Sequence, residues 1–235
     1  MATRHAARRT DTSREALLAA ATHEFALHGF AGASVDTIAR RARVNKAMIY
    51  YHFKSKQRLY LEILRGVFSS IGDRTAAVAA TDAPAAEKIA ADARAISSEV
   101  DARPYLPPIM MREVAEGVRR LDTDTLRLMS RLFFNLHTIL EQGVRDGAFR
   151  RADPLLTYFS LISPIFFFRA SLPVRTAMSL HNIVAEAKVL DNDVFLDHLT
   201  TNLLHALAPD APPAAASPSA RRHAPSRRPR SGDPA

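Results

Sequence analysis

Cations and aromatic rings are interleaved over a short stretch of the chain, residues 41–53, which reads RARVNKAMIYYHF. Its thirteen positions hold four arginine, lysine or histidine side chains and three aromatic rings, with no glycine. This composition is too polar for a core strand and too aromatic for an ordinary solvated helix face. Cations that contact phosphates, beside rings that have an apolar face and a polar tip, suit the edge of a nucleic-acid groove. The residue types therefore favour polyanion binding.

Patterns for catalysis or metal binding are missing from the sequence. There is no cysteine, which excludes disulfides, thiolate zinc sites and cysteine nucleophiles. The nine histidines are scattered, and although His198 and His205 could share a helix face with Asp197 nearby, no HExxH spacing occurs. The sequence also lacks a GxSxG motif and a glycine-rich phosphate loop. We expect no enzyme activity, no cofactor and no metal site.

Positive charge is concentrated at the N-terminal end of the chain. Residues 1–65 hold 12 Lys or Arg against 5 Asp or Glu, so they carry +7 of the net +8, whereas residues 66–208 hold 15 against 17. This asymmetry suggests a polyanion partner for the N-terminal end only. Solvated arginines in a generically basic composition are the alternative explanation for the same charge.

No segment of the sequence has the features of a membrane span or of a secretory signal. The most apolar stretch, Leu155 to Phe168, is shorter than the roughly 18–20 residues that a span requires, and Pro164 interrupts it. The basic N-terminus lacks an apolar core of the kind that signal peptides have. We therefore expect a cytoplasmic protein without a membrane partner.

Helix signals follow one another along the chain, and no alternating strand pattern with hairpin turns is present. The expected fold class is therefore all-α, with about nine helices. Gly29 should end the first helix in a left-handed conformation, and Pro164 should kink a later one. The expected helices start near Thr12, Ser34, Asn45, Ser55, Pro84, Ile109, Asp122, Asp153, and either Asp191 or Asp193.

The second and third of these helices have the spacing of a helix-turn-helix. With Val35 as the first position, apolar residues fall where the two helices face inward, and the small Ala39 sits where they must cross closely. Phe53 is expected in the core below them. The inward positions are Ile38, Ala39, Ala42, Val44 and Ile49.

The stretch FALHGFAGASVDTIARRARVNKAMIYYHFKSKQRLYLEIL, residues 25–64, resembles the DNA-binding domain of the TetR/AcrR family of bacterial repressors. Farther along, MREVAEG (111–117) and GAFRRADP (147–154) resemble parts of the ligand-binding domains of that family. The resemblance implies an N-terminal three-helix helix-turn-helix domain followed by a helical domain for effector binding and dimerisation. The matching positions are Phe25, Gly29, Phe30, Ser34, Val35, Ile38, Ala39, Val44, Lys46, Ile49, Tyr50, Phe53, Lys56 and Leu59.

On this basis we divide the chain into four parts. They are a disordered basic N-terminus (1–11), the helix-turn-helix domain (12–65), the effector and dimerisation domain (66–208), and a disordered basic tail rich in Pro, Ala and Arg (209–235). The tail has no aliphatic side chain larger than alanine, so it cannot bury enough surface to offset the entropy of ordering.

The resemblance also implies which residues contact DNA. The N-terminal end of the third helix should enter the major groove, so that Lys46, Ala47 and Tyr50 read bases. Arg43 departs from the family pattern, because that turn position is usually glycine and a left-handed arginine costs about 1 kcal/mol. The expected phosphate contacts are Ser34, Arg43, Asn45, Tyr51, His52 and Lys56.

The larger domain should hold a small-molecule effector and the dimer contact, although such residues at helical spacing are commonly core. Arg112, Glu113 and Arg169 are either buried polar anchors or surface charges. The expected pocket walls are Met110, Met111, Phe133, Phe134, His137, Tyr158 and Phe159. The expected dimer interface is Phe166, Phe167, Leu196, Leu199 and Leu203, from the last two long helices.

Together these features predict a repressor that binds a palindromic double-stranded operator as a homodimer and is released by a small-molecule effector. The alternative is a helical DNA-binding protein that acts without a ligand or under the control of a protein partner. A well-formed apolar pocket in the large domain would favour the first, and a solid core the second.

Overall fold

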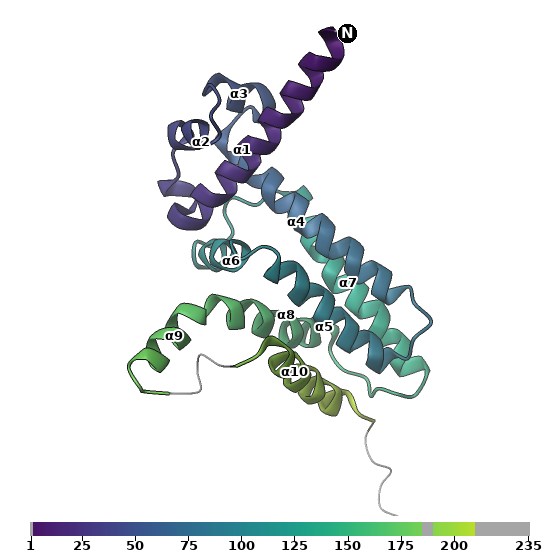
Figure 1. Cartoon of the computed structure of the whole chain (residues 1–235). Coiled ribbons are helices and arrows are strands. Elements are labelled where there is room, and N and C mark those ends of the chain that lie inside the picture. Colours follow the sequence, from purple (N-terminus) through teal and green to yellow (C-terminus); the bar gives the residue numbers. More distant parts are fainter. Residues whose placement is uncertain (1, 185–189, 210–235) are drawn as a thin grey trace, which may run out of the picture.

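Ten helices and no strands make up the part of the chain that the structure describes, residues 2–184 and 190–209 of this computed structural model (Figure 1). The expected all-α class is confirmed, with one more helix than the sequence indicated. The helices are α1 (Ala2–Gly32), α2 (Val35–Arg41), α3 (Ala47–Phe53), α4 (Lys56–Ala79), α5 (Ala85–Asp101), α6 (Leu106–Ala115), α7 (Thr123–Arg145), α8 (Pro154–Ala170), α9 (Leu172–Leu180) and α10 (Asn192–Leu207). The predicted disordered tail lies outside the described residues from position 210 onward.

The helix starts follow local sequence signals. Ser34, Ser55, Asp122, Asp153 and Asp191 each accept a hydrogen bond from a backbone amide in the first turn of α2, α4, α7, α8 and α10. A helix leaves its first four amides without internal partners, and these side chains satisfy some of them. The capping residues predicted from the sequence are therefore confirmed for these helices.

Two of the predicted helix starts are wrong. Helix α1 begins at Ala2, not at a Thr12 cap after eleven disordered residues, because alanine and arginine favour helix and no Gly or Pro interrupts residues 2–12. Helix α6 begins at Leu106, ahead of the predicted Ile109, because prolines are compatible with the first turn of a helix and Pro107 and Pro108 occupy it here.

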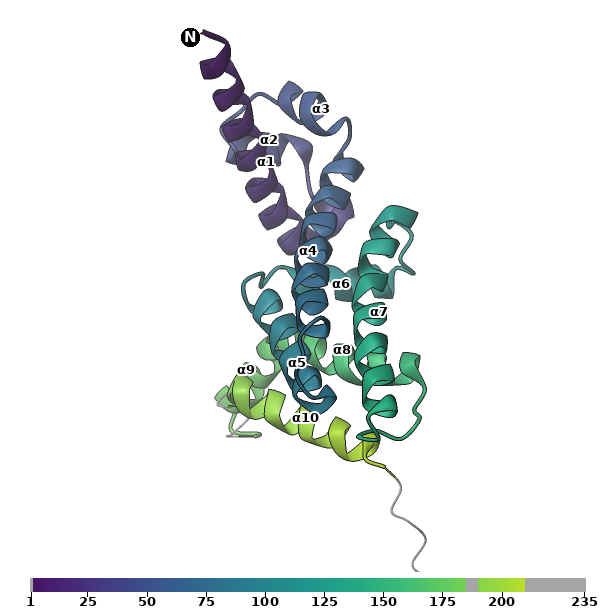
Figure 2. The same cartoon turned by 90° about the vertical axis from the view of Figure 1, so that its right-hand side faces the viewer.

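Helix α4 connects the small N-terminal helices to the larger body. Helices α1 to α3 gather around its first turns, and it then runs along α7 and α5 (Figures 1 and 2). The body places α5 between α4, α7, α8 and α10, and its core is built from residues such as Leu64, Ile71, Ile89, Ile96 and Ile139. Motion of α4 relative to the body would therefore move the N-terminal helices.

The spacing of Leu126, Met129, Phe133, Leu136 and Leu140 predicts one buried face of α7, and the structure buries that face only in part. Leu136 and Leu140 are buried as expected, but Leu126 is 45% exposed, and Leu132 and Ile139 take core positions that the sequence pattern did not indicate. The predicted stripe followed a strict a/d spacing, whereas the core touches a wider face of this helix.

Helix α6 joins the body to the N-terminal helices through two adjacent side chains. The Arg112 guanidinium donates to the carbonyl oxygens of Ala26 at 2.7 Å and of Phe25 and Leu27 at 3.3 Å. These carbonyls become available because α1 is kinked at Gly29, where φ is 66°. The predicted left-handed Gly29 is confirmed, and it creates the acceptors that Arg112 binds.

The second side chain, Glu113, is buried and accepts a hydrogen bond from the Tyr60 hydroxyl of α4 at 2.7 Å. Burial, followed by this hydrogen bond, raises the pKa of Tyr60 well above its usual range. Arg120 supplies the counter-charge at 3.2 Å from the same carboxylate oxygen. Glu113 is therefore a buried polar anchor, one of the two roles that the sequence left open.

No single helix in the described residues is both long and apolar enough to cross a bilayer. Helices α8 and α9 would meet the length and composition test only as a pair, and they are bent by 50° at the break between them.

Candidate nucleic-acid interface

Helices α2 and α3 form a helix-turn-helix whose inner face is closed by apolar contacts. Ile38 and Ala39 of α2 and Ile49 and Phe53 of α3 are buried, as predicted. Arg14 of α1 lies over the Phe53 ring, with 5.4 Å between its guanidinium carbon and the ring centroid. Because one side of α3 is fixed in this way, the opposite side is presented outward.

The turn between the two helices passes through Arg43, which has φ of 55° and an exposed side chain. Its amide donates to the Arg40 carbonyl at 3.1 Å, and the next amide, of Val44, donates to Ala39 at 3.1 Å. The turn therefore has the left-handed geometry that normally selects glycine, and a side chain there costs about 1 kcal/mol.

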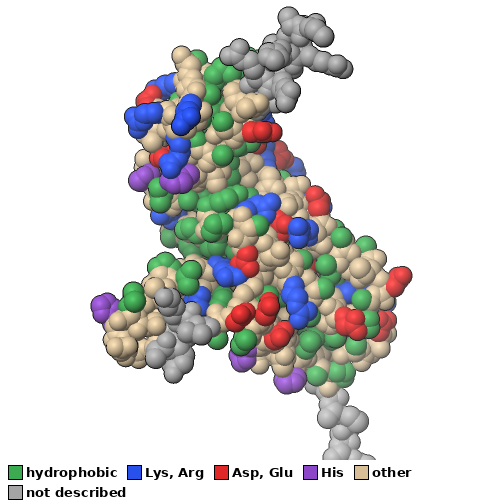
Figure 3. Space-filling view, in the orientation of Figure 1, with side chains coloured by type: hydrophobic (Ala, Val, Ile, Leu, Met, Phe, Trp, Pro, Cys, Tyr) green, Lys and Arg blue, Asp and Glu red, His purple; other side chains and the backbone are tan. Residues whose placement is uncertain are grey.

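The outward side of α3 carries the residues predicted to read bases. Lys46, Ala47 and Tyr50 are all exposed, and Tyr51, at 64% exposure, extends the same outer region. Asn45 caps α3 by accepting from the amide of Ala47 at 2.8 Å. Lys and Arg side chains gather over the N-terminal helices on the side of α2 (Figure 3). This region can donate hydrogen bonds to base edges and phosphates.

Lys46 is held by a carboxylate of the neighbouring helix. Its Nζ atom lies 2.8 Å and 3.0 Å from the two carboxylate oxygens of Asp36, in the first turn of α2. The hydrogen bond from Lys46 to Asp36 raises the pKa of the lysine. In this arrangement the lysine is charged, exposed and placed at the entrance to α3.

Lys56, which was expected to bind phosphate, donates hydrogen bonds to backbone carbonyls of the N-terminal helices. Its ammonium donates to the carbonyls of Phe30 at 2.7 Å and Ala33 at 3.0 Å, and it lies 4.5 Å from the centroid of the Phe30 ring. Burial, with the charge of Arg120, lowers the pKa of Lys56. The lysine therefore bridges the end of α1 and the start of α2.

Two other predicted phosphate contacts have partners within the fold. The His52 ring nitrogen lies 3.1 Å from the Ser13 hydroxyl, and Ser34 accepts from the Asp36 amide at 3.2 Å. Two exposed cations, Arg40 at the end of α2 and Lys54 directly after α3, were not identified from the sequence. The clusters of Lys and Arg at residues 40–43 and 54–58 are the sequence feature that could have identified these two cations.

The predicted pocket walls lie in different surroundings. Met110 is buried in the core, while Phe133 contacts Phe134, His137 and Tyr158 with ring centroids 5.2–6.0 Å apart. Phe134 and Phe159 are more than half exposed. The rings of Phe133 and Tyr158 pack against each other between α7 and α8, and the effector pocket stays a prediction.

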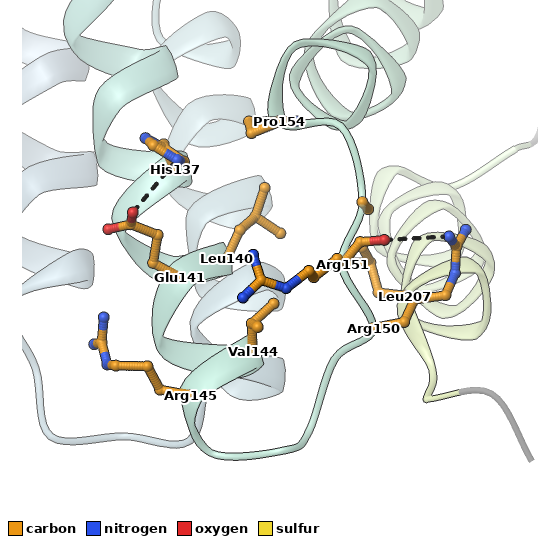
Figure 4. Close-up of a pocket in the computed structure, with 10 residues that line it drawn as sticks. His137, Leu140, Glu141, Val144, Arg145, Arg150, Arg151, Pro154 and Leu207 are labelled. Carbon is orange, nitrogen blue, oxygen red and sulfur yellow. Dashed lines mark hydrogen bonds and ion pairs between the residues drawn. The ribbon is translucent and has the colours of Figure 1, made fainter. Parts of the chain in front are cut away.

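Two of the clefts in the described part of the body each contain one of the predicted pocket residues. One, of about 480 Å³, lies between the end of α7, the start of α8 and the end of α10, and His137 contributes to it (Figure 4). Arg145, Arg150 and Arg151 border it, and Arg150 also donates to the Ala206 carbonyl at 2.7 Å. The other, of about 560 Å³, contains Met111.

The predicted dimer residues are only partly on the surface. Phe166, Leu196 and Leu203 are buried within the subunit, and Leu199 is half-buried, so these four do not present an exposed face to a partner. Helical spacing alone could not separate core positions from interface positions. Phe167 is 66% exposed and remains available. Among the described residues, no group of three His, Asp or Glu side chains is placed to hold a metal ion.

The family model described as "Bacterial regulatory proteins, tetR family" matches residues 17–63, which include the whole helix-turn-helix. The chain is 26% identical over 164 residues to the HTH-type transcriptional repressor NicS of Pseudomonas putida, covering 69% of this chain and 77% of that protein. It is 42% identical over 59 residues to the repressor SCO4008 of Streptomyces coelicolor, covering 25% and 31% of the two chains.

The whole fold is also similar to solved structures. A TetR family transcription regulator from Marinobacter aquaeolei VT8 superposes with a TM-score of 0.66 at 21% identity, over 86% of this chain and 98% of the other. Three observations point to a DNA-binding domain of this kind. They are the helical fold, the exposed position of α3 and the sequence match over residues 17–63. Residues 17–63 match the DNA-binding domain of the tetR family of bacterial regulatory proteins, and the whole chain has the fold of a solved regulator of that family.

Proposed function

We propose that this regulator is a cytoplasmic repressor that binds a palindromic operator as a homodimer and leaves it when a small-molecule effector binds. The observation that supports the DNA contact best is the geometry of α3, which buries Ile49 and exposes Lys46, Ala47 and Tyr50. A recognition helix with a fixed inner side and a polar outer side suits the major groove. The relative NicS is itself named as a repressor.

In this proposal Lys46 donates to guanine, Ala47 allows close approach to a base, and Tyr50 contacts the groove one turn further along. Arg43, Asn45 and Tyr51 hold the phosphates, since their side chains are exposed around the same helix. Ser34 and His52 join them only by exchanging their present partners. We leave Lys56 out of the DNA contacts because its ammonium is committed to two carbonyls.

The dimer contact that we propose uses α8, where an apolar face remains on the surface of the subunit. Leu155, Phe159 and Phe167 are each more than half exposed and lie at intervals of four or eight residues, on one side of the helix. Apolar surface of this kind is typical of an interface between subunits. Two subunits would place two recognition helices on the two halves of a palindrome.

The DNA contact is tested with an operator selected from sheared genomic DNA. The Lys46→Ala variant should lose a base contact worth about 1–3 kcal/mol, so the affinity ratio of operator to random DNA should fall by about tenfold or more. Fluorescence anisotropy measures both affinities. The control is Arg127→Ala, which removes an exposed cation from α7, outside the helix-turn-helix. Equal operator preference in the wild type and in Lys46→Ala would refute the assignment.

One observation favours the alternative, in which DNA binding is controlled by a protein partner or is not controlled at all. The rings of Phe133 and Tyr158 fill the place where the sequence predicted an effector pocket. A regulator of this second kind would show no saturable small-molecule binding that weakens its hold on the operator. A screen of metabolites for release of labelled operator separates the two.

A further inference from the structure

A cleft of about 560 Å³ lies between α6 on one side and the corner of α8 and α9 on the other. The space-filling view is indented on this side of the molecule (Figure 3), in the region where Figure 1 places α6 above α9. The end of α5 forms its back. Its volume is within the range of sites that hold small organic ligands.

The walls of this cleft are mostly apolar. They include Val100 of α5, Pro107 and Met111 of α6, and Leu172 and Pro173 of α9. Leu172 is 48% exposed, and α9 as a whole buries no residue. Apolar surface therefore remains uncovered on both sides of the cleft, and an apolar ligand body would remove it from water.

One guanidinium borders the apolar walls, and a second lies close to it. Arg169 lines the cleft and pairs with Asp101, yet its Nε atom is buried without a hydrogen-bond partner. Arg175 of α9 lies over the Phe168 ring at 3.9 Å and donates to the Phe168 carbonyl at 2.9 Å, and its Nε atom is also buried and unpartnered. Burial and the charge of Arg169 lower the pKa of Arg175.

At this corner the two arginines therefore carry more positive charge than the paired carboxylate balances. Among the described residues, Asp101 is the only carboxylate paired with either arginine. An arginine fork binds a carboxylate through two parallel hydrogen bonds, and burial strengthens such a contact. A bound anion at Arg169 would supply a second negative charge at a corner where two arginines share one paired carboxylate.

The cleft also reaches the contact between the body and the N-terminal helices. Arg112 lines the cleft, and its side chain donates to the carbonyls of Ala26 and Leu27 at the kink of α1. Met111, its neighbour in α6, is part of the cleft wall. A ligand that pushes on this part of α6 would therefore change how α1 is held.

We propose that this cleft binds a small carboxylic acid with an apolar body, with the carboxylate on Arg169 and the body between α6 and α9. The proposal deepens the proposed function, because it identifies this cleft as the effector site of the regulator. It places the ligand outside the aromatic cluster of α7 and α8 and outside the basic cleft of Figure 4.

The test uses the full chain and three probes of equal length, octanoate, octanamide and octylamine, in isothermal titration calorimetry. Octanoate should bind saturably, and the neutral and cationic probes should bind about tenfold more weakly or worse, since they cannot pair with Arg169. The Arg169→Gln variant should lose the preference for octanoate. The control is Arg151→Gln, which removes an arginine from the other cleft and should bind octanoate like the wild type.

A second variant tests the cleft independently, in case Arg169→Gln does not fold. Leu172 is exposed, so Leu172→Asp should leave the helical circular-dichroism spectrum unchanged while its charge repels octanoate from the cleft. No saturable octanoate binding up to about 10 mM, equal binding of all three probes, or loss of binding in Arg151→Gln alone would each overturn the proposal. Octanoate binding that weakens as the protein concentration rises would overturn it too, because it would mean that a second copy of the chain covers the cleft.

Operator release is measured separately from ligand binding. If octanoate binds through Arg169 and also releases the labelled operator, both the site and its role as effector site are supported. If it binds through Arg169 without releasing the operator, the effector role is refuted and the ligand site stands. If the chain binds no operator in the absence of octanoate, the proposed function fails, whatever the calorimetry shows.

Discussion

The Nζ atom of Lys46 lies 2.8 Å from a carboxylate oxygen of Asp36, so the first residue of the recognition region is tied to the neighbouring helix when no DNA is present. Both side chains are exposed, which makes the pair weak and easily exchanged. A guanine that accepts from Lys46 must share the ammonium with this carboxylate or replace it. Asp36 therefore competes with DNA for the lysine that we propose reads a base.

Replacing Asp36 with Asn should strengthen DNA binding. The change removes the competing carboxylate and a negative charge near the phosphates, so affinity for random DNA should rise several-fold at low salt and converge on the wild type at high salt. Anisotropy titrations over a salt series measure this. The control is Asp197→Asn, which breaks a similar exposed pair with Arg94 on the far side of the body. A weaker complex with DNA would contradict the competition.

Replacing Arg43 with Gly should stabilise the fold and alter the salt dependence of DNA binding. Glycine relieves the left-handed strain at φ 55°, which should raise the free energy of unfolding by about 1 kcal/mol. If Arg43 holds a phosphate, the slope of log affinity against log salt should become shallower by about one contact.

The matched control is Val118→Gly, because Val118 has φ of 58° in the turn after α6, outside α2 and α3. It should stabilise the protein to a similar extent without changing the salt slope. Denaturant unfolding and the same anisotropy series give both quantities. An unchanged slope in Arg43→Gly would show that Arg43 is only tolerated in the turn.

Asp92 should make the stability fall as the pH rises toward neutrality. Its side chain is buried in α5 with Oδ1 unpartnered, and burial raises its pKa from 3.8 to about 7. The folded protein therefore keeps a proton that the unfolded chain loses near pH 4. Stability from this group is full below pH 4 and decreases between pH 4 and pH 7, by a few kcal/mol in order of magnitude.

The Asp92→Asn variant should lack this decrease, because an amide of the same shape does not titrate. Thermal unfolding at pH 4.5, 6 and 7.5 makes the comparison, with the exposed Asp124→Asn as control. Parallel profiles for the wild type and Asp92→Asn would refute a raised pKa at this position.

Two glycines in long helices should respond in opposite ways to alanine. A Cβ on Gly143 of α7 would lie 2.0 Å from the Phe149 ring, so Gly143→Ala must displace that ring and should destabilise the fold by about 1–3 kcal/mol. A Cβ on Gly66 of α4 would point into open space, with no neighbouring side chain within 4 Å, so Gly66→Ala should stabilise by about 0.5–1 kcal/mol. Urea titrations of both variants test this, and a stabilised Gly143→Ala would contradict the described packing.

The features that the sequence predicted correctly are local ones, which depend on residues close together in the chain. Ser34 and Asp153 cap their helices, and Gly29 is left-handed, because each conformation is set within a few residues. The buried side of the helix-turn-helix also followed from spacing. The extra helix α9 was missed because its short sequence has no buried face to produce a periodic pattern.

What the sequence did not predict depends on contacts between distant segments. Lys56 turns inward because the carbonyls of Phe30 and Ala33 lie beside it, which no local pattern reveals. Leu196 and Leu203 carry the same apolar pattern whether they face the core or a partner subunit. The cleft at Arg169 is built from four helices, so its members are not adjacent in the chain.

The kink at Gly29 has a consequence for the evolution of related sequences. The Cδ atom of Arg112 lies 3.3 Å from where a Cβ of residue 29 would be, and the guanidinium depends on carbonyls that the kink releases. A side chain at position 29 would both straighten α1 and push the arginine away. Among close homologues the two positions should therefore covary, with glycine kept wherever arginine is kept and both replaced together.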